Sequence, residues 1–574
     1  MHSALRHGVT LDDWTVSELI CHSRNHTDSP GDTVTGPLSQ TDKDPHQLKH
    51  HPLGLHMTPL CPRPPKAAGF RSADVRAASA AVALALALTA CTGGEADPAA
   101  SGGSASPSPS STPATGERDE LTVVDSKHIP GLEEKTVTED LAGGVEAELS
   151  YPSIPNADPF TDRLAEIIKL EAHDFAGAEP DAKSYSVDWD VSVARGNVMA
   201  VRLTQREKDG DGERTRHSTY WYNTESGHTA YSTELLAGQE QLEKLHSLVE
   251  DRLLDRDGVR SASLQPIAEV YDSLGFNANG DLVAEFDEGQ VAPAGKGRVR
   301  AVVPADEVRP LLSSLGERAQ QAAVVVTPKF EIEQAASAPK GGKSAGSVPG
   351  MHPPAAGEVD CDDPSSKCIA LTFDDGPGAR TPRLLNALEK HDAKATFFVT
   401  GGPVRQHPDT VRRTYAEGHE LANHTVHHPD LTSIAKSGVT DELTTVNKLV
   451  RRETGYTMDL MRPPYGATDG AVADVAEKMG QAQILWNVDT YDWRDRDAGI
   501  VSDRAVQRAQ PGSIVLMHDI HSTTVKAVPE ILERLDDKGY TMVTVSQLLG
   551  ETEPGKKYTE GKPEESPDSP SPSP

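Results

Sequence analysis

The sequence contains few cysteines and no Cys-x-x-Cys pair. Its 574 residues include five cysteines, Cys21, Cys61, Cys91, Cys361 and Cys368. Thiolate zinc sites are built from closely spaced cysteine pairs, so such a site is not expected. Cys361 and Cys368 are close enough in sequence to close a small loop. In an exported protein this spacing predicts a disulfide, whereas two reduced thiols would suit a cytosolic protein.

Long hydrophobic runs and an excess of positive charge are also absent. The formal net charge is -31 and the hydrophobic content is 36%. Nucleic-acid binding requires basic patches, so this balance argues against a nucleic-acid partner. No run reaches the roughly 18 apolar residues of a membrane-spanning helix. The chain exceeds the length that one hydrophobic core usually supports, so we expect two folded units joined by linkers.

One short apolar run, residues 77–88, has the features of an export signal. Arg71 and Arg76 precede it, and Leu-Thr-Ala-Cys follows, ending at Cys91. A basic flank, a short apolar core and small residues near a cleavage point are typical of such signals. The last four residues resemble a bacterial lipobox, which implies that Cys91 is the lipidated first residue of the mature chain. A buried Ala/Leu-rich helix is the alternative, but the Gly/Ser/Pro-rich stretch that follows suits a tether.

The remaining segments divide the chain by composition. Residues 1–56 show no apolar period, and export signals belong at an N-terminus, so translation is hypothesised to begin near Met57. We therefore interpret 1–90 as a mis-assigned start plus a lipoprotein signal segment. Further segments are assigned as linkers and a tail of low apolar content: a flexible linker at 91–119, a second linker at 326–358 and a disordered tail at 551–574.

Residues 120–325 are predicted to form a smaller α+β domain. Alternating apolar residues at 187–193 and 198–203 indicate strands. Apolar residues at helical spacing in 160–175 and 242–254 indicate helices. We find no catalytic motif in this segment.

Residues 359–550 contain the chemistry-bearing patterns, beginning with two adjacent carboxylates. Ile369–Phe373 is a compact apolar strand that leads directly into the turn Asp374-Asp375-Gly376-Pro377. The carboxyl ends of strands are where α/β barrels gather their reactive side chains. Taken alone, this turn is more simply interpreted as a solvated one.

A second pattern is the histidine-rich segment Asn423–Pro429. His424 and His428 are four residues apart, a spacing that on a helical turn puts both imidazoles on one face. Neutral imidazole is a common zinc ligand. His427 competes for this assignment, because an i, i+3 pair with His424 is also geometrically suitable.

Three more polar sets follow in order. They are Arg462-Pro463-Pro464-Tyr465-Gly466, then Asp489–Trp493, then the strand Ser513–Met517 ending in His518-Asp519. Helical patterns at 382–390 and 525–535 alternate with them. This alternation predicts a parallel β/α barrel with its site at the carboxyl ends of the strands.

The five motifs, in this order, resemble those of the polysaccharide deacetylase (NodB-homology) family, carbohydrate esterase family 4. The resemblance covers about a third of the chain. It implies an α/β fold: a distorted (β/α) barrel with fewer than eight units, preceded here by the smaller α+β domain. Residues 282–303 of that domain weakly resemble a domain found beside deacetylase domains in some bacterial wall proteins, which suggests wall binding.

The resemblance also implies roles at the site. Asp375, His424 and His428 would hold one divalent metal, most commonly zinc, which polarises the acetyl carbonyl. Asp374 would be the general base, and Arg462 would hold it in place. The backbone N–H of Tyr465 would help to stabilise the oxyanion.

The remaining implied roles concern the leaving group and the acetyl pocket. His518 would be the general acid that protonates the departing amine. Asp489 would orient His518 and favour its charged form, with Asp492 as the weaker candidate. Trp493 and Leu516 would form the pocket for the acetyl methyl group.

The function implied is removal of N-acetyl groups from an N-acetylglucosamine-containing polymer, foremost cell-wall peptidoglycan. An exported lipoprotein at the outer face of the membrane or in the wall, anchored only through Cys91, faces that polymer. Acetyl-xylan and chitin oligosaccharides are alternative substrates. A non-catalytic wall-binding or sensor lipoprotein, acting through residues 121–325, is the alternative of a different class.

Overall fold

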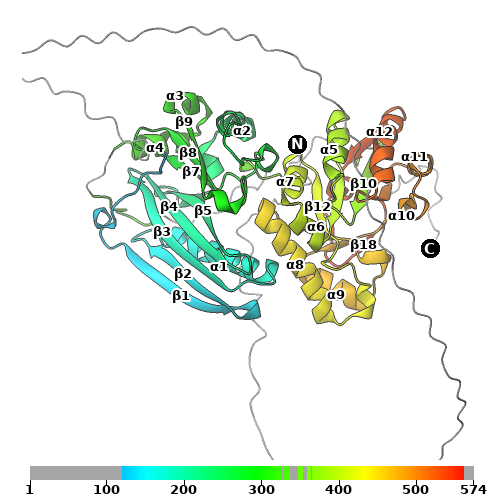
Figure 1. Ribbon diagram of the computed structural model, residues 1–574, viewed down its shortest axis with the longest axis horizontal. Coiled ribbons are helices and arrows are strands. Elements are labelled where there is room, and N and C mark those ends of the chain that lie inside the picture. Colours follow the sequence, from blue (N-terminus) through cyan, green and yellow to red (C-terminus); the bar gives the residue numbers. More distant parts are fainter. Residues whose placement is uncertain (1–118, 326–328, 337–346, 353–358, 364, 562–574) are drawn as a thin grey trace, which may run out of the picture. The chain divides into compact units, whose positions relative to one another are not determined.

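The structure, a computed structural model, describes a large part of the chain (Figure 1): residues 119–325, 329–336, 347–352, 359–363 and 365–561. The export signal, the start near Met57 and the lipidation of Cys91 lie outside the described residues and stay predictions. Among the helices that the structure describes, none has both the length and the hydrophobicity needed to cross a bilayer.

The first described domain begins with a six-stranded sheet in the order β1-β2-β3-β4-β5-β6. Strands β2 and β3 are parallel because helix α1, Asp158–Ala178, crosses over between them, and the other neighbours are antiparallel. The predicted strands at 187–193 and 198–203 lie within β3 and β4, and the predicted helix at 160–175 lies within α1. The strands are β1 (Glu133–Leu141), β2 (Val145–Ser153), β3 (Ser184–Arg195), β4 (Val198–Lys208), β5 (Glu213–Asn223) and β6 (His228–Ala230).

A three-stranded antiparallel sheet, β7-β8-β9, completes this domain. The predicted helix at 242–254 corresponds to α2, which buries Leu242, Leu245, Val249 and Leu253 along one face. The domain therefore has the expected α+β composition. The elements are α2 (Gln239–Leu253), β7 (Ser273–Phe276), β8 (Leu282–Phe286), β9 (Val299–Val303), α3 (Ala305–Val308) and α4 (Ser314–Ala323).

Part of the predicted linker at 326–358 is packed rather than free. Phe330 is buried in the apolar cluster that contains α1, and its N–H donates to the carbonyl of His128 at 2.7 Å. Val348 is also buried. The linker prediction is wrong at these residues, because single apolar side chains anchor a segment whose composition is otherwise that of a linker.

The second domain is built on a nine-stranded sheet. Its order is β15-β16-β10-β11-β12-β13-β14-β18, with β17 also paired to β10, and every pairing among these described strands is parallel. The strands are β10 (Cys368–Asp374), β11 (Thr396–Val399), β12 (Glu420–Asn423), β13 (Leu460–Met461), β14 (Ala482–Ile484), β15 (Val488–Asp489), β16 (Ile514–His518), β17 (Thr541–Val543) and β18 (Lys557–Tyr558).

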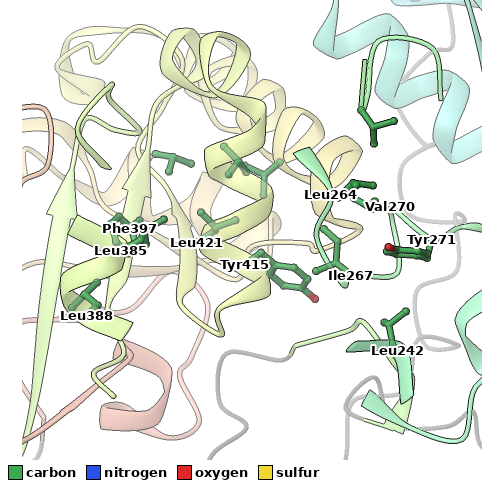
Figure 2. Packing of buried hydrophobic residues seen from close by; sticks show 14 of the residues in the cluster. Leu242, Leu264, Ile267, Val270, Tyr271, Leu385, Leu388, Phe397, Tyr415 and Leu421 are labelled. Carbon is green, nitrogen blue, oxygen red and sulfur yellow. The ribbon is translucent and has the colours of Figure 1, made fainter. Parts of the chain in front are cut away.

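Helices alternate with these strands, as the sequence predicts. All seven residues of β10 are buried, which is expected of a parallel strand covered on both faces. Figure 2 shows Leu385 and Leu388 of α5 beside Phe397 of β11. The helices are α5 (Thr381–Lys390), α6 (Gly401–Gln406), α7 (Pro408–Ala416), α8 (Lys436–Thr454), α9 (Gly470–Lys478), α10 (Asp492–Asp495), α11 (Ala498–Gln507), α12 (Ser522–Asp536) and α13 (Val545–Leu549).

Residues 551–561, predicted as part of the disordered tail, instead extend the barrel. Strand β18 pairs with β14, Glu560 forms a bridge with Ser513 just before β16, and the N–H of Gly561 donates to the carbonyl of Gly512 at 2.7 Å. This segment therefore links β14, near one end of the sheet, to the residue that precedes β16. The tail prediction is wrong here because the pairing uses backbone groups, which the polar sequence does not reveal. The predicted distorted α/β barrel is confirmed.

The disulfide predicted between Cys361 and Cys368 is present in the structure. It ties the segment that precedes the barrel to the first residue of β10.

Phe373 and Phe397 stack in the barrel core, with ring centroids 5.2 Å apart. Shortening one of these side chains tests how much this packing stabilises the strands. We expect Phe397→Ala to lower the local opening free energy of β10 and β11 by about 3–5 kcal/mol, because a large buried ring leaves a cavity. Amide hydrogen exchange of these strands measures it. The exposed Ile500 of α11 is the control, and Ile500→Ala should change that free energy by at most about 0.5 kcal/mol. Equal effects would contradict the packing described.

Candidate active site

Polar side chains gather where the strands of the barrel end. Asp374, Asn423, Asp489 and His518 are the last residues of β10, β12, β15 and β16. Because parallel strands direct their carboxyl ends to one edge, side chains that are distant in sequence converge there. This is the edge that the sequence patterns predict to carry the site.

Asp375, His424 and His428 form a group of metal-ligand type. Asp375 Oδ1 lies 3.6 Å from His424 Nε2 and 3.4 Å from His428 Nε2, and the three ligand atoms lie within 4.8 Å of one another. Tetrahedral zinc bonds of about 2.0–2.1 Å correspond to ligand separations of roughly 3.3 Å. One carboxylate and two imidazoles at this spacing therefore fit a divalent cation.

The protonation of His424 also suits a ligand. Its Nδ1 lies 2.7 Å from the carbonyl of Arg462, so Nδ1–H donates to that oxygen. The lone pair is then on Nε2, the atom that faces Asp375. Burial lowers the pKa of His424 to about 3, which keeps the imidazole neutral at physiological pH.

The segment carrying the two histidines is a loop that contains two left-handed residues, not the helical turn considered from the sequence. Thr425 and His428 have φ values of 69° and 57°. Such values are strained for residues other than glycine. Local hydrogen bonds hold the loop, since Asn423 Oδ1 accepts the Thr425 N–H at 2.9 Å and Thr425 Oγ1 accepts the His428 N–H at 3.1 Å.

His427, the competing ligand candidate, lies outside the group. Its Nδ1 is 2.8 Å from Glu442 Oε1, and its side chain is 78% exposed. Of the two pairings left open by the sequence, the structure brings His424 together with His428.

Asp374 is buried against an equally buried arginine. Arg462 Nη1 donates to Asp374 Oδ1 at 2.7 Å, and its other nitrogens donate to the carbonyls of Ile484 and Leu485 at 3.0 Å. Burial raises the pKa of Asp374, while the charges of Arg462 and His518 act in the opposite direction. Asp374 Oδ2 lies 3.7 Å from His424 Nε2, so one oxygen is held by Arg462 and the other lies beside the ligand group.

The partner of His518 is Asp492 and not Asp489. Asp492 Oδ1 accepts from His518 Nδ1, and Oδ2 accepts from the His518 N–H, both at 2.8 Å. Thr524 Oγ1 donates to the same Oδ2 at 2.6 Å. Burial alone would lower the pKa of His518, but the hydrogen bond to Asp492 and the charges of Asp374 and Asp375 raise it to about 9.

The expectation that Asp489 orients His518 is therefore wrong. The carboxylate of Asp489 accepts the N–H of Tyr491 at 2.7 Å. The chain turns at Tyr491, whose φ is 52°, and helix α10 then starts at Asp492. This turn points Asp492 at β16, and the spacing of the two aspartates alone does not determine which one does so.

The three residues expected near the acetyl group have different exposures. Leu516 is buried within β16, whereas Trp493 and Tyr465 are exposed. The ring of Tyr465 packs edge-to-face on His428, with centroids 4.6 Å apart. Their contacts with substrate stay predictions.

Sequence reasoning missed three supporting residues. Thr524 holds Asp492, Glu442 holds His427, and Asn447 Oδ1 accepts from Asn423 Nδ2 at 2.9 Å. Each lies on a helix far along the chain from the residue it contacts. No local pattern marks such residues, because only the packing of the helix on the strand ends makes the contact.

The parallel barrel and its polar edge place the protein among α/β-barrel enzymes, whose reactive side chains lie at the strand ends. Comparison with known proteins narrows this class. Residues 362–484 match the polysaccharide deacetylase family. The chain is also 35% identical over 192 residues to peptidoglycan-N-acetylmuramic acid deacetylase PdaA of Bacillus subtilis, covering 33% of this chain and 73% of that protein. The chain belongs to the polysaccharide deacetylase family.

Two other relatives share the same region. Peptidoglycan-N-acetylglucosamine deacetylase PgdA of Listeria monocytogenes is 45% identical over 196 residues, covering 34% of this chain and 41% of that protein. Peptidoglycan-N-acetylmuramic acid deacetylase PdaC of Bacillus subtilis is 40% identical over 201 residues, covering 35% and 42%. The matched region thus spans only about two fifths of the length of these two relatives.

The two neighbouring histidines make a direct test of the ligand group. We expect His428→Ala to weaken Zn²⁺ binding by at least about 100-fold, because a ligand is lost. His427→Ala should change the affinity by less than about threefold, because its ring is not part of the group. Competition with a chromophoric chelator measures both constants. Stronger weakening by His427→Ala would show that the wrong histidine is assigned.

Proposed function

We propose that this chain is a metal-dependent N-deacetylase of a polymer containing N-acetylglucosamine or N-acetylmuramic acid, foremost peptidoglycan. One observation carries the proposal: the ligand group is accompanied by a carboxylate, Asp374, and an imidazolium, His518. Arg462 holds the carboxylate and Asp492 holds the imidazolium. These are the base and the acid that amide hydrolysis requires.

Asp374 is proposed to take the proton from the attacking water. Arg462 holds Oδ1, which leaves Oδ2 next to the ligand group to receive the proton. A divalent cation bound by Asp375, His424 and His428 would polarise the acetyl carbonyl as a Lewis acid. Zinc is the metal that this set of nitrogen and oxygen ligands suits.

His518 is proposed to protonate the departing nitrogen. An amine anion is too basic to leave an amide, so an acid must supply a proton as the C–N bond breaks. Asp492 holds the proton on Nδ1, which leaves the proton on Nε2 free for transfer. The raised pKa keeps the imidazole charged near neutrality.

The remaining groups would surround the acetyl carbon. The backbone N–H of Tyr465 is proposed to donate to the oxyanion. Trp493 and Leu516 are proposed to enclose the methyl group.

The relatives' names indicate the substrate. PgdA is named a peptidoglycan-N-acetylglucosamine deacetylase, and PdaA and PdaC are named peptidoglycan-N-acetylmuramic acid deacetylases. We accordingly propose that the protein is exported, anchored by a lipid at Cys91, and acts on the wall. Residues 120–325 are proposed to place the barrel on that polymer.

Acetate release tests the proposed function. The purified protein should release acetate from peptidoglycan faster than from chitin oligosaccharides or acetyl-xylan, and a chelator should stop the release. Asp374→Asn should keep bound metal but lower turnover by about 100- to 10,000-fold, because the base is lost. Near-normal turnover of this variant would refute the base assignment. Faster release from acetyl-xylan would favour ester hydrolysis instead.

The pH profile tests the partner of His518. Activity needs the imidazolium, so it should fall as pH rises through the pKa of His518. Asp492→Asn removes the carboxylate that raises this pKa and should move the alkaline limb of kcat/KM down by about 1–3 pH units. Asp489→Asn is the matched control and should shift the limb less. A larger shift for Asp489→Asn would contradict the assignment of Asp492.

A further inference from the structure

Glu442 of α8 holds the centre of the loop that carries the two histidine ligands. Its Oε2 accepts the N–H of Val426 at 2.8 Å and the N–H of His427 at 2.9 Å. Its Oε1 lies 2.8 Å from His427 Nδ1. Only 14% of the Glu442 side chain is exposed, whereas the His427 side chain is 78% exposed, so the hydrogen bond to the Val426 N–H is the most shielded of the three.

The loop needs such support because its backbone is strained on both sides of this contact. Thr425 precedes the two amides and His428 follows them, and both residues have positive φ. Conformations of this kind are sparsely populated by residues other than glycine and persist only where the surroundings impose them. Hydrogen bonds from N–H groups to a carboxylate are stronger than those to a neutral acceptor. Glu442 is therefore well suited to impose the loop conformation.

The same helix also holds the beginning of the loop. Asn423 Nδ2 donates to the carbonyl of Leu443 at 2.8 Å and to Asn447 Oδ1 at 2.9 Å. Asn423 Oδ1 in turn accepts the Thr425 N–H. Leu443 and Asn447 are buried residues of α8. Adjacent turns of one packed helix thus fix the segment from residue 423 to residue 427.

We propose that Glu442 is the positioning residue for the metal ligands. Its hydrogen bonds to the Val426 and His427 amides set the separation and direction of the His424 and His428 imidazoles, and so determine metal affinity without contacting the metal. The proposal rests on the metal-binding part of the proposed function. It depends on neither the substrate nor the reaction.

Variants at this position separate geometry from charge. In Glu442→Gln, the amide oxygen can accept both backbone N–H groups and the amide nitrogen can donate to His427 Nδ1. Glu442→Asp keeps the charge but withdraws the carboxylate by one methylene. Glu442→Ala removes the contact altogether. A positioning role predicts that Gln is tolerated and that Asp and Ala are not.

The measurement is the affinity of the full chain for Zn²⁺, by competition with a chromophoric chelator, together with the visible spectrum of the Co²⁺-substituted protein. Glu442→Ala and Glu442→Asp should weaken Zn²⁺ binding by about 10- to 100-fold and alter the Co²⁺ bands. Glu442→Gln should stay within about threefold of the wild-type affinity. These readouts require no turnover.

Two control variants remove neighbouring groups only. His427→Ala deletes the ring contact but leaves both amide hydrogen bonds, and Asp441→Ala deletes an exposed carboxylate one residue away on α8. Each should leave the Zn²⁺ affinity within about threefold. A loss in Asp441→Ala equal to that in Glu442→Ala would overturn the proposal, since charge alone would then explain the effect.

The proposal would also be overturned if folded Glu442→Ala kept the wild-type Zn²⁺ affinity and an unchanged Co²⁺ spectrum. Should that variant fail to fold, Glu442→Asp and Glu442→Gln decide. The positioning role is contradicted if Glu442→Asp binds Zn²⁺ with wild-type affinity. It is also contradicted if Glu442→Gln loses as much Zn²⁺ affinity as Glu442→Asp. If the protein released no acetate while the affinities kept the expected order, the proposed function would fail and the role of Glu442 would stand.

Discussion

The buried pair Arg462–Asp374 is the interaction on which the rest of the site depends. Arg462 has no exposed surface, and its guanidinium packs 3.9 Å from the ring centroid of Phe398. A guanidinium without water needs acceptors for its N–H groups, and here they come from Asp374 on β10 and from the carbonyls of Ile484 and Leu485 at β14. Removing one partner of such a pair leaves an uncompensated buried charge, which costs about 3–5 kcal/mol. This cost disfavours any displacement of the Asp374 carboxylate from Arg462.

With Asp374 fixed, the next residue is free to take a different direction. Strand β10 ends at Asp374, and Asp375 adopts a φ of 69°. Its carboxylate reaches the two histidines, while that of Asp374 remains buried on Arg462. At the end of β15, two aspartates close in sequence again have different partners. There Asp489 accepts a backbone N–H, and the turn at Tyr491 sends Asp492 to His518.

These cases show how much of the site the sequence could predict. Strands β10 and β16 and helices α5 and α12 follow from apolar periodicity, and the order of the motifs locates the strand ends. The choice between Asp489 and Asp492 depends on one left-handed residue, which the spacing of the aspartates does not encode. Strand β18 is formed through backbone pairing of a polar segment, so no side-chain pattern indicates it. Glu442 makes its contacts only after α8 has packed against the strand ends.

Strained backbone and ligand geometry are connected at this edge of the barrel. Asp375, Thr425, His428 and Tyr465 all have positive φ, and each of the four is a ligand candidate or contacts one. Left-handed conformations turn the chain sharply, which lets residues close in sequence direct side chains toward one point. Their cost must be offset by hydrogen bonds that do not involve the ligand atoms themselves, because those atoms have to keep their lone pairs available. Helix α8 meets this requirement. Glu442 accepts from two backbone amides of the loop, and Leu443 and Asn447 accept from the side chain of Asn423. None of these hydrogen bonds uses the Nε2 atom of His424 or His428. The arrangement of the His424 and His428 side chains therefore depends on the packing of helix α8 as well as on the motif that contains the two histidines.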